Sequence, residues 1–255
     1  MSLSSSRFDV IRPLFHWLRL RGVDLQSPHR RDAANALMVQ KRLMHGADVR
    51  TIMDCGAHRG RVAQEYATAF RGANIFSFEP TPATFEALKA SVAHEVRIEP
   101  VNAAVGETEG TVDFYIAPFE QANSLLPRHP GDPSAETMVT ARVVRIEEFC
   151  RSRGIARVEI LKLDIEGFEL PAIRGCGRMI DEQRIDLLHC ETRFDAGPGG
   201  SGGSNTTFPD LCAYLLPRGY EFFGLYDPRY AKNLQFAWGD VMFVSRDVVA
   251  RTRRA

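Results

Sequence analysis

Two segments of the chain combine a short apolar run with residues suited to binding a nucleoside. The run at 51–55 is followed by a turn that contains Gly56 and Gly60, and a helical pattern begins directly afterwards. A second apolar run, 74–78, is followed by Glu79. A carboxylate at the carboxyl end of the second strand of a parallel sheet is placed to accept the two hydroxyls of a ribose. The pattern therefore predicts a strand, a glycine turn, a helix and a second strand that together bind a nucleoside-containing cofactor.

The candidate cofactor residues lie in this turn and at the ends of the next two strands. Glycine lets the backbone approach a ligand closely, and the amides at a helix start favour electron-rich groups. The spacing is Gly-x-x-x-Gly and not the Gly-x-Gly-x-x-Gly of dinucleotide-binding proteins, so an ordinary glycine turn is the alternative. His58 is either a cofactor contact or a solvent-facing turn residue. The candidates from the residue pattern are Asp54, Gly56, Ala57, His58, Gly60, Glu79 and Asn102.

Two later strand ends carry acidic side chains that could perform catalysis. Asp164 ends the apolar run 158–164, and Glu191 follows the run 185–190. If neighbouring strands end together, the two carboxylates share one pocket and could hold a divalent cation such as Mg²⁺ or act as acid and base. Alternation sends His189 to the same side as Glu191.

Each of these catalytic candidates also has a structural alternative. His189 could be an ordinary structural histidine. Glu166 and Glu169 could simply decorate a helix amino terminus, where negative charge is favourable. Asp195 is a further candidate that could join Asp164 and Glu191 in holding a cation. Asn233 and Trp238 are weaker site candidates, because turn or core roles are favoured for them.

Strand-like and helical segments alternate from residue 51 onward, which is typical of a parallel sheet covered by helices. A hairpin is expected between 111–116 and 140–146. The glycine- and serine-rich residues 195–206 predict a mobile loop, either a lid over the substrate or a tolerated surface insertion. The other expected strands are 51–55, 74–78, 96–101, 158–164, 185–190, 219–226 and 236–244, the last two antiparallel, and the expected helices are 61–70, 82–93, 168–181 and 207–217.

The two ends of the chain differ from this alternating region. Apolar residues at helical spacing predict amphipathic helices at 7–21 and 31–46. Trp17 lies beside arginines in the first helix, and packing on its own domain or on a second subunit is favoured over a membrane surface. The expected organisation is an N-terminal helical extension (1–49), a cofactor-binding domain (50–247) and a basic tail (248–255), with a homo-oligomer forming through the N-terminal helices.

Composition narrows the classes of partner. Lys plus Arg and Asp plus Glu both number 32, so the formal net charge is zero and gives no reason to expect nucleic-acid or membrane binding. The 5 cysteines are widely spaced and include no Cys-x-x-Cys pair, so buried, reduced thiols in a cytoplasmic protein are expected. No apolar run approaches the roughly 20 residues that span a bilayer.

Taken together, the segments resemble the FkbM family of S-adenosylmethionine-dependent methyltransferases. The resemblance covers roughly residues 50–245 and rests on the order and spacing of five elements. These are Asp-Cys-Gly-Ala-His-Arg-Gly at 54–60, Phe-Glu-Pro-Thr-Pro at 78–82, Asn-Ala-Ala-Val-Gly at 102–106, Lys-Leu-Asp-Ile-Glu-Gly at 162–167 with Glu169, and Glu191.

The resemblance implies a Rossmann-like, seven-stranded methyltransferase sheet whose last strand is antiparallel. It also implies that residues 54–60 line the methionine part of S-adenosylmethionine, that Glu79 binds the ribose, and that Asn102 and Ala103 approach the adenine. The implied reaction is O-methylation of a sugar, polyketide or other small metabolite, with Asp164 as base or cation ligand. A nicotinamide-dependent oxidoreductase and a non-catalytic cofactor-binding scaffold are the alternatives.

Overall fold

The structure, a computed structural model, describes residues 35–116, 137–194 and 206–252. The chain divides into two compact units, residues 1–40 and 41–255. Of the first unit only residues 35–40 are described, and they include the start of helix α3 (Ala36–Leu43). The expected helix at 7–21, with Trp17, lies outside the described residues, as do Asp195 and nearly all of the Gly/Ser segment.

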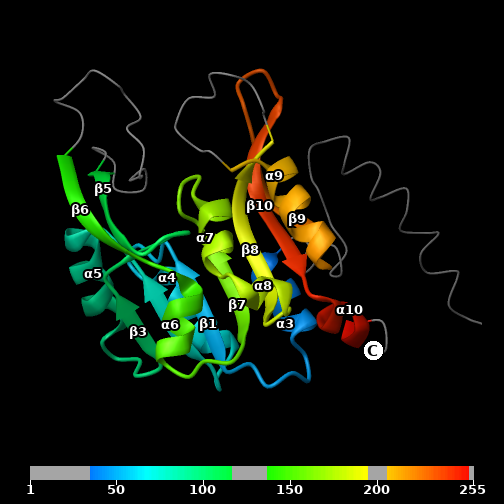
Figure 1. Ribbon diagram of the computed structural model, residues 1–255, viewed down its shortest axis with the longest axis horizontal. Coiled ribbons are helices and arrows are strands. Elements are labelled where there is room, and N and C mark those ends of the chain that lie inside the picture. The colour runs from blue at the N-terminus through cyan, green and yellow to red at the C-terminus, as the bar shows by residue number, and fades with distance from the viewer. Residues whose placement is uncertain (1–34, 117–136, 195–205, 253–255) are drawn as a thin grey trace, which may run out of the picture. The chain divides into compact units, whose positions relative to one another are not determined.

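Within the described part of the second unit, seven strands form one sheet in the order β3-β2-β1-β7-β8-β10-β9 (Figure 1). Strand β10 is antiparallel to both of its neighbours, and the other pairings are parallel. The predicted fold class, a mostly parallel α/β sheet whose last strand is antiparallel, is confirmed. The strands are β1 (Thr51–Cys55), β2 (Asn74–Phe78), β3 (Ile98–Val101), β7 (Val158–Leu163), β8 (Ile185–Arg193), β9 (Glu221–Tyr230) and β10 (Phe236–Val244).

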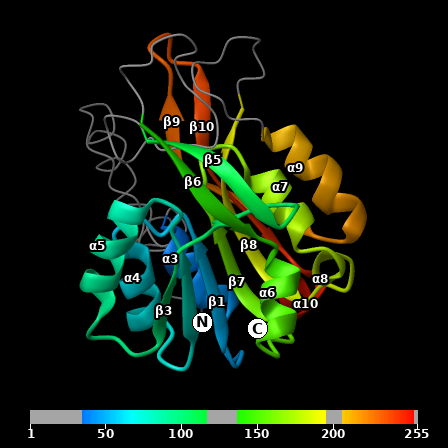
Figure 2. The same cartoon turned by 60° about the vertical axis from the view of Figure 1, so that its left-hand side comes forward.

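Helices cover the sheet on both faces, as the continuous burial of its central strands requires. One face packs against α6 (Ile146–Ser152), α7 (Glu169–Gly175), α8 (Arg178–Asp181) and α9 (Phe208–Leu215) in a single apolar core. Helices α4 (Arg61–Ala69) and α5 (Pro82–Val92) follow β1 and β2 and lie on the other side of the sheet (Figure 2). The helices after the neighbouring strands β1 and β7 therefore lie on opposite faces, and such a switch point is where α/β sheets bind ligands.

A smaller sheet is inserted after β3. It consists of β4 (Ala104–Val105), β6 (Thr137–Val144) and β5 (Gly110–Ile116), with β5 and β6 antiparallel along their length. The hairpin expected from the sequence is thus present.

Local sequence signals explain several of the helix boundaries. Gly60 adopts φ +83° immediately before α4, and Pro82 occupies the first position of α5. Thr207 and Asp210 form a reciprocal capping box at the start of α9. The expected helix 168–181 is divided into α7 and α8 at Gly177, which has φ +51°.

The carboxyl-terminal segment differs from the expected basic tail. Residues Arg246–Thr252 form helix α10, in which Val248 is buried. The guanidinium of Arg251 contacts the buried Asp186 carboxylate at 3.1 Å. The basic composition of residues 248–255 gives no indication of this contact, which depends on tertiary structure. No helix among the described residues has the length and apolar character needed to cross a membrane.

Candidate functional site

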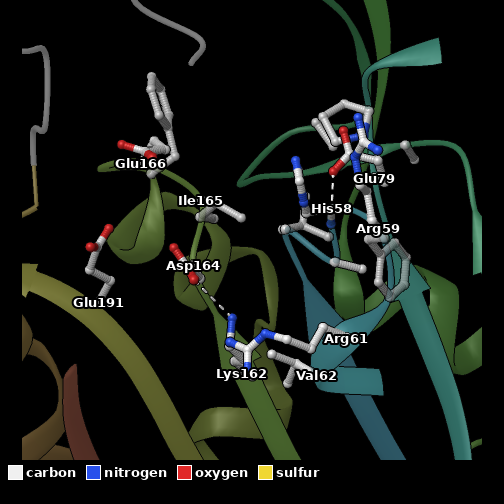
Figure 3. A pocket seen from close by; sticks show the side chains of 18 of the residues that line it. His58, Arg59, Arg61, Val62, Glu79, Lys162, Asp164, Ile165, Glu166 and Glu191 are labelled. Atoms are coloured by element: carbon white, nitrogen blue, oxygen red, sulfur yellow. Dashed lines mark hydrogen bonds and ion pairs between the residues drawn. The ribbon is translucent and has the colours of Figure 1, made fainter. Parts of the chain in front are cut away.

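A cavity of about 510 Å³ lies at the carboxyl ends of β1, β2, β3, β7 and β8 (Figure 3). Its size is within the range of roughly 300–1,000 Å³ that is typical of small-molecule sites. Eight of the sequence candidates line it, and they come from these five strand ends. They are Gly56, Ala57, His58, Glu79, Ala103, Asp164, Glu166 and Glu191.

The floor of the cavity is set by a close approach between β1 and β7. The amides of Gly56 and Ala57 both donate to the Phe78 carbonyl on β2, at 3.0 and 2.9 Å. Gly56 has φ +81°, and a Cβ atom at this position would lie 1.9 Å from the carbonyl oxygen of Asp164. Only glycine fits this position, because both the backbone conformation and the neighbouring strand exclude a side chain.

Glu79 is fixed by backbone amides at the end of β2. Its two carboxylate oxygens accept from the amides of His58 (3.1 Å) and Thr81 (2.9 Å). Burial raises the pKa of Glu79, and these hydrogen bonds oppose that rise. Asn102 does not line the cavity; its side-chain amide donates to the Glu79 carbonyl at 2.9 Å and holds this strand end. The carboxylate keeps lone pairs that could accept hydroxyl groups.

A buried charged row lies beneath the cavity. Asp54, Lys162 and His189 occupy matching register positions on β1, β7 and β8. The Lys162 ammonium is 3.1 Å from Asp164 Oδ2 and 3.8 Å from Asp54 Oδ1. Burial opposes the charge on Lys162, but Asp164 and Asp54 outweigh it, so the pKa of Lys162 is raised. Lys162 therefore stays protonated, and its ammonium lies between Asp54 in the buried row and Asp164 in the cavity lining.

Asp54 is completely buried in this row. Neither of its carboxylate oxygens has a hydrogen-bond partner among the described residues. Burial raises the pKa of Asp54, and Lys162 lowers it in part. A buried carboxylate without hydrogen bonds is costly and is retained where it serves a site.

Three carboxylates line the β7 and β8 side of the cavity (Figure 3): Asp164, Glu166 and Glu191. Burial raises the pKa of Glu191 to about 8, and Asp164 and Glu166 add to the rise. Glu191 is therefore mostly protonated at neutral pH and ionises near pH 8.

Glu169 belongs to the helix start behind this group and is not a surface decoration. Its Oε1 accepts from the amides of Ile165 (3.2 Å) and Gly167 (3.1 Å), which fixes the loop that carries Asp164 and Glu166. Burial raises the pKa of Glu169 to about 7. Glu166 has φ +56°, and this left-handed backbone gives the loop its sharp turn.

The prediction of a metal site gains no support. Among the residues that the structure describes, no three His, Cys, Asp or Glu side chains are arranged to hold a metal ion. Asp164 and Glu191 do lie in one pocket, but Asp164 is engaged by Lys162.

Two further sequence candidates lie outside the cavity. His189 is buried, with Nε2 3.2 Å from Asp240 Oδ2 on β10. Burial opposes ionisation of Asp240, but the contact with His189 and the charges of Lys162 and Arg229 together outweigh it and lower the pKa of Asp240. Gly60 packs against α5, where an added Cβ would lie 2.8 Å from the side chains of Leu88 and Val92. Both positions support the architecture around the site.

The two weaker candidates on the last hairpin have different environments. Asn233 is a turn residue whose side chain contacts Gln235, as expected. Trp238 is 39% exposed, so the expected core role is wrong.

Sequence reasoning missed several lining residues. Lys162 begins the Lys-Leu-Asp-Ile-Glu-Gly motif at 162–167. Its position in an otherwise mostly apolar strand is the feature of the sequence that indicates a role. Phe168 and Val105 line the cavity on the apolar side, and Arg59, Arg61 and Arg229 bring positive charge to it. Arg229 comes from β9, far along the chain, and no local pattern indicated it.

Comparisons with known proteins agree on one reaction class. The family model described as "Methyltransferase FkbM domain" matches residues 54–222. The chain is 26% identical over 124 residues to the hexuronic acid methyltransferase AglP of Haloferax volcanii, covering 48% of this chain and 49% of that protein. It is 27% identical over 163 residues to the 31-O-demethyl-FK506 methyltransferase FkbM of Streptomyces tacrolimicus, covering 52% and 63%.

The alignments with these relatives thus span from about half to less than two thirds of the relatives' length. Among solved structures, the precorrin-6y C5,15-methyltransferase of Geobacter metallireducens superimposes with a TM-score of 0.45 and 12% identity, covering 82% of this chain and 87% of that one.

Proposed function

The chain belongs to the FkbM methyltransferase family, and on that premise we propose that it transfers a methyl group from S-adenosylmethionine to a hydroxyl group of a small-molecule acceptor. One observation carries the proposal. A single cavity joins a carboxylate fixed by backbone amides, Glu79, to a group of carboxylates of which one, Glu191, ionises near pH 8.

The residues on the β1 and β2 side fit a nucleoside. Glu79 would hold the ribose hydroxyls, because its position is fixed by the amides of His58 and Thr81. Ala103 would lie against the adenine, and Gly56 and Ala57 would leave room for the methionine part. Buried Asp54 would favour a cationic amino group above it through the same field that holds Lys162.

When bound, S-adenosylmethionine supplies a methyl group on a positively charged sulfonium. The carboxylates of Asp164 and Glu166 place negative charge on the same cavity wall and would favour that charge. The ammonium of Lys162 fixes the position of Asp164 through a 3.1 Å contact.

Glu191 is the residue we assign as general base. An alcohol is a weak nucleophile until its proton is removed, and a base works best when its pKa is near the working pH. Asp164 is already engaged by Lys162, whereas Glu191 makes no such ion pair among the described residues and has its pKa raised to about 8. Direct proton removal by Glu191 is preferred to an Mg²⁺-bound alkoxide, because three suitable metal ligands are not brought together in the described residues.

The acceptor is proposed to be a sugar, a polyketide or another small metabolite. The names of the relatives support this class, since one is named for a hexuronic acid and another for 31-O-demethyl-FK506. The zero net charge of the chain argues against a nucleic-acid acceptor.

The test is a transfer assay with tritiated S-adenosylmethionine and fractionated metabolites from the source cell, with Mg²⁺ or with EDTA. We expect label in a metabolite fraction, equal rates in both buffers, and a large loss in Glu191→Gln. Label that appears only with Mg²⁺ would overturn the direct-base mechanism. No transfer to any fraction, despite cofactor binding, would favour a non-catalytic cofactor-binding protein.

A further inference from the structure

The antiparallel part of the sheet carries two successive rows of side chains, and each row contributes one residue, Glu191 or Arg229, to the cavity lining. In the first row Glu191 on β8 pairs with Asp240 on β10, which pairs with Tyr226 on β9. The next row outward consists of Arg193, Trp238 and Arg229 on the same three strands. Residues directly opposite each other in antiparallel strands project from the same face.

Arg229 connects the outer row with the site. It lines the same cavity as Glu191, although it lies on the edge strand β9. The β9–β10 register is irregular on both sides of Trp238, and Arg229, three residues after Tyr226, is the residue that pairs with Trp238. Same-face neighbours along a strand are roughly 7 Å apart, so the outer row begins about one sugar ring away from Glu191.

Trp238 gives this row a flat apolar surface. The indole is 39% exposed even though both of its strand neighbours in the row are arginines. An exposed aromatic ring beside polar groups is suited to a partner with one apolar and one polar face. The C–H face of a sugar ring combined with its hydroxyls has that character.

The charges around Trp238 specify the partner further. Arg229 lines the cavity and its charge helps to lower the pKa of Asp240, and a guanidinium is the group that best matches a carboxylate or phosphate. The negative groups facing it, Asp240 and Glu191, belong to the inner row, and Asp240 is paired with His189. Arginines thus lie beside the indole on both neighbouring strands, and acidic groups lie in the inner row.

We propose that Trp238 and Arg229 form the acceptor site and bind a sugar ring that carries an anionic group, with the hydroxyl to be methylated directed toward Glu191. This inference rests on the proposed methyl transfer and names its acceptor class. A carboxylate and a phosphate share the chemistry that Arg229 recognises, so both are tested.

The experiment uses Trp238 as its own reporter. The sequence has 2 tryptophans, so Trp17→Phe leaves Trp238 as the single fluorophore. The full chain saturated with S-adenosylhomocysteine is titrated with methyl glucuronide, glucose 6-phosphate, uncharged methyl glucoside and a short oligonucleotide. We expect a saturable change in emission with at least one anionic sugar, at a concentration about tenfold lower than with the glucoside. Calorimetry on the unmodified chain makes the same comparison without the Trp17 change.

Two matched variants locate the effect. Arg229→Gln should lose the preference for the anionic sugar and leave glucoside binding unchanged, about a tenfold change for one charged hydrogen-bonding group. Lys232→Gln removes an exposed cation from the same hairpin and should keep the preference. Equal binding of charged and uncharged sugars, no sugar binding at all, or tighter binding of the oligonucleotide would each overturn the inference.

Failure of the acceptor inference is distinguishable from failure of the proposed function. If S-adenosylhomocysteine itself does not bind in the calorimeter, the proposed function fails. If it binds and the sugars show no preference, only the acceptor site is wrong.

Discussion

The two halves of the cavity wall are built in different ways. On the β1 and β2 side, backbone atoms define the site: amides hold Glu79, and Gly56 lies against the Asp164 carbonyl. On the β7, β8 and β9 side, charged side chains from separate strands define it. Asp164, Glu191 and Arg229 come together only through strand register.

The difference indicates what each half has to do. A half whose key residues are held in place by backbone atoms has a fixed geometry and suits a ligand that is constant, here the proposed methyl donor. A side-chain-built half can be altered one residue at a time, and it suits the variable partner, the acceptor. The predictions below test this division.

The largest effect is expected at the junction of the two halves. Gly56→Ala places a methyl group 1.9 Å from the Asp164 carbonyl oxygen at a residue with φ +81°. We expect a loss of about 3 kcal/mol or more in unfolding free energy and no S-adenosylhomocysteine binding, measured by denaturant unfolding and calorimetry. The control is Gly154→Ala, at φ +66° with no atom within 4 Å of the added Cβ. It measures the cost of the backbone conformation without a steric clash and should lower the free energy of unfolding by about 1 kcal/mol. Similar losses in both variants would show that the contact between β1 and β7 is unimportant.

Glu191→Gln should affect turnover and spare the cofactor half. Once an acceptor is available, we expect turnover to fall roughly 10²- to 10⁴-fold, as for a lost general base, with unchanged S-adenosylhomocysteine affinity. Because burial raises the pKa of Glu191 to about 8 and the base must be ionised, wild-type turnover should rise with pH through that value. A flat profile between pH 6 and 9, or full turnover in the variant, would assign the base elsewhere.

Glu79→Gln should have the opposite effect and weaken the cofactor binding that Glu191→Gln leaves unchanged. The amide replaces one of the two acceptor oxygens with a donor that faces a backbone N–H, so the loop at His58 and Thr81 loses a hydrogen bond. We expect S-adenosylhomocysteine affinity to fall about 10- to 100-fold. Glu86→Gln, an exposed change on α5, is the matched control and should bind as the wild type does. Equal affinities in the two variants would remove Glu79 from the cofactor half.

The smallest effect is on the pH dependence of stability. The pKa of buried Glu169 is about 7 in the folded chain against an ordinary 4.5, so the folded state favours the protonated form. Its contribution is complete below about pH 4.5 and is lost as the pH rises through about 7. Glu169→Gln keeps an acceptor oxygen for Ile165 and Gly167, and it should reduce the fall in melting temperature between pH 5 and 8.5. Part of the fall should remain, since the pKa of Glu191 is also raised; an unchanged slope would contradict the assignment.

The sequence was sufficient for the fold because the strands are short, apolar and separated by clear turns. The parallel strands lie within about two residues of their expected starts, and the family resemblance is confirmed by the match over residues 54–222. The helix α10 was missed because its arginines resemble a solvated tail, whereas the contact of Arg251 with Asp186 depends on tertiary structure.

The site was predictable only where it depends on positions next to a strand end. Gly56, Glu79, Asp164 and Glu191 line the cavity, but Asp54 and His189 lie one row lower. The alternation of side chains along a strand predicts which face of the sheet a residue lies on, but not how far it lies from the cavity. A sequence therefore cannot distinguish the cavity-lining row from the row below it. Arg229 reaches the cavity, and Trp238 lies opposite Arg229, through the register of an antiparallel hairpin that the sequence did not specify.

The most direct test is a calorimetric titration of the wild type and Glu191→Gln with S-adenosylhomocysteine and with NAD. If the cofactor half is independent of the acceptor half, both proteins should bind one S-adenosylhomocysteine per chain with equal affinity. Neither protein should bind NAD. Binding of NAD, or loss of S-adenosylhomocysteine binding in Glu191→Gln, would contradict it.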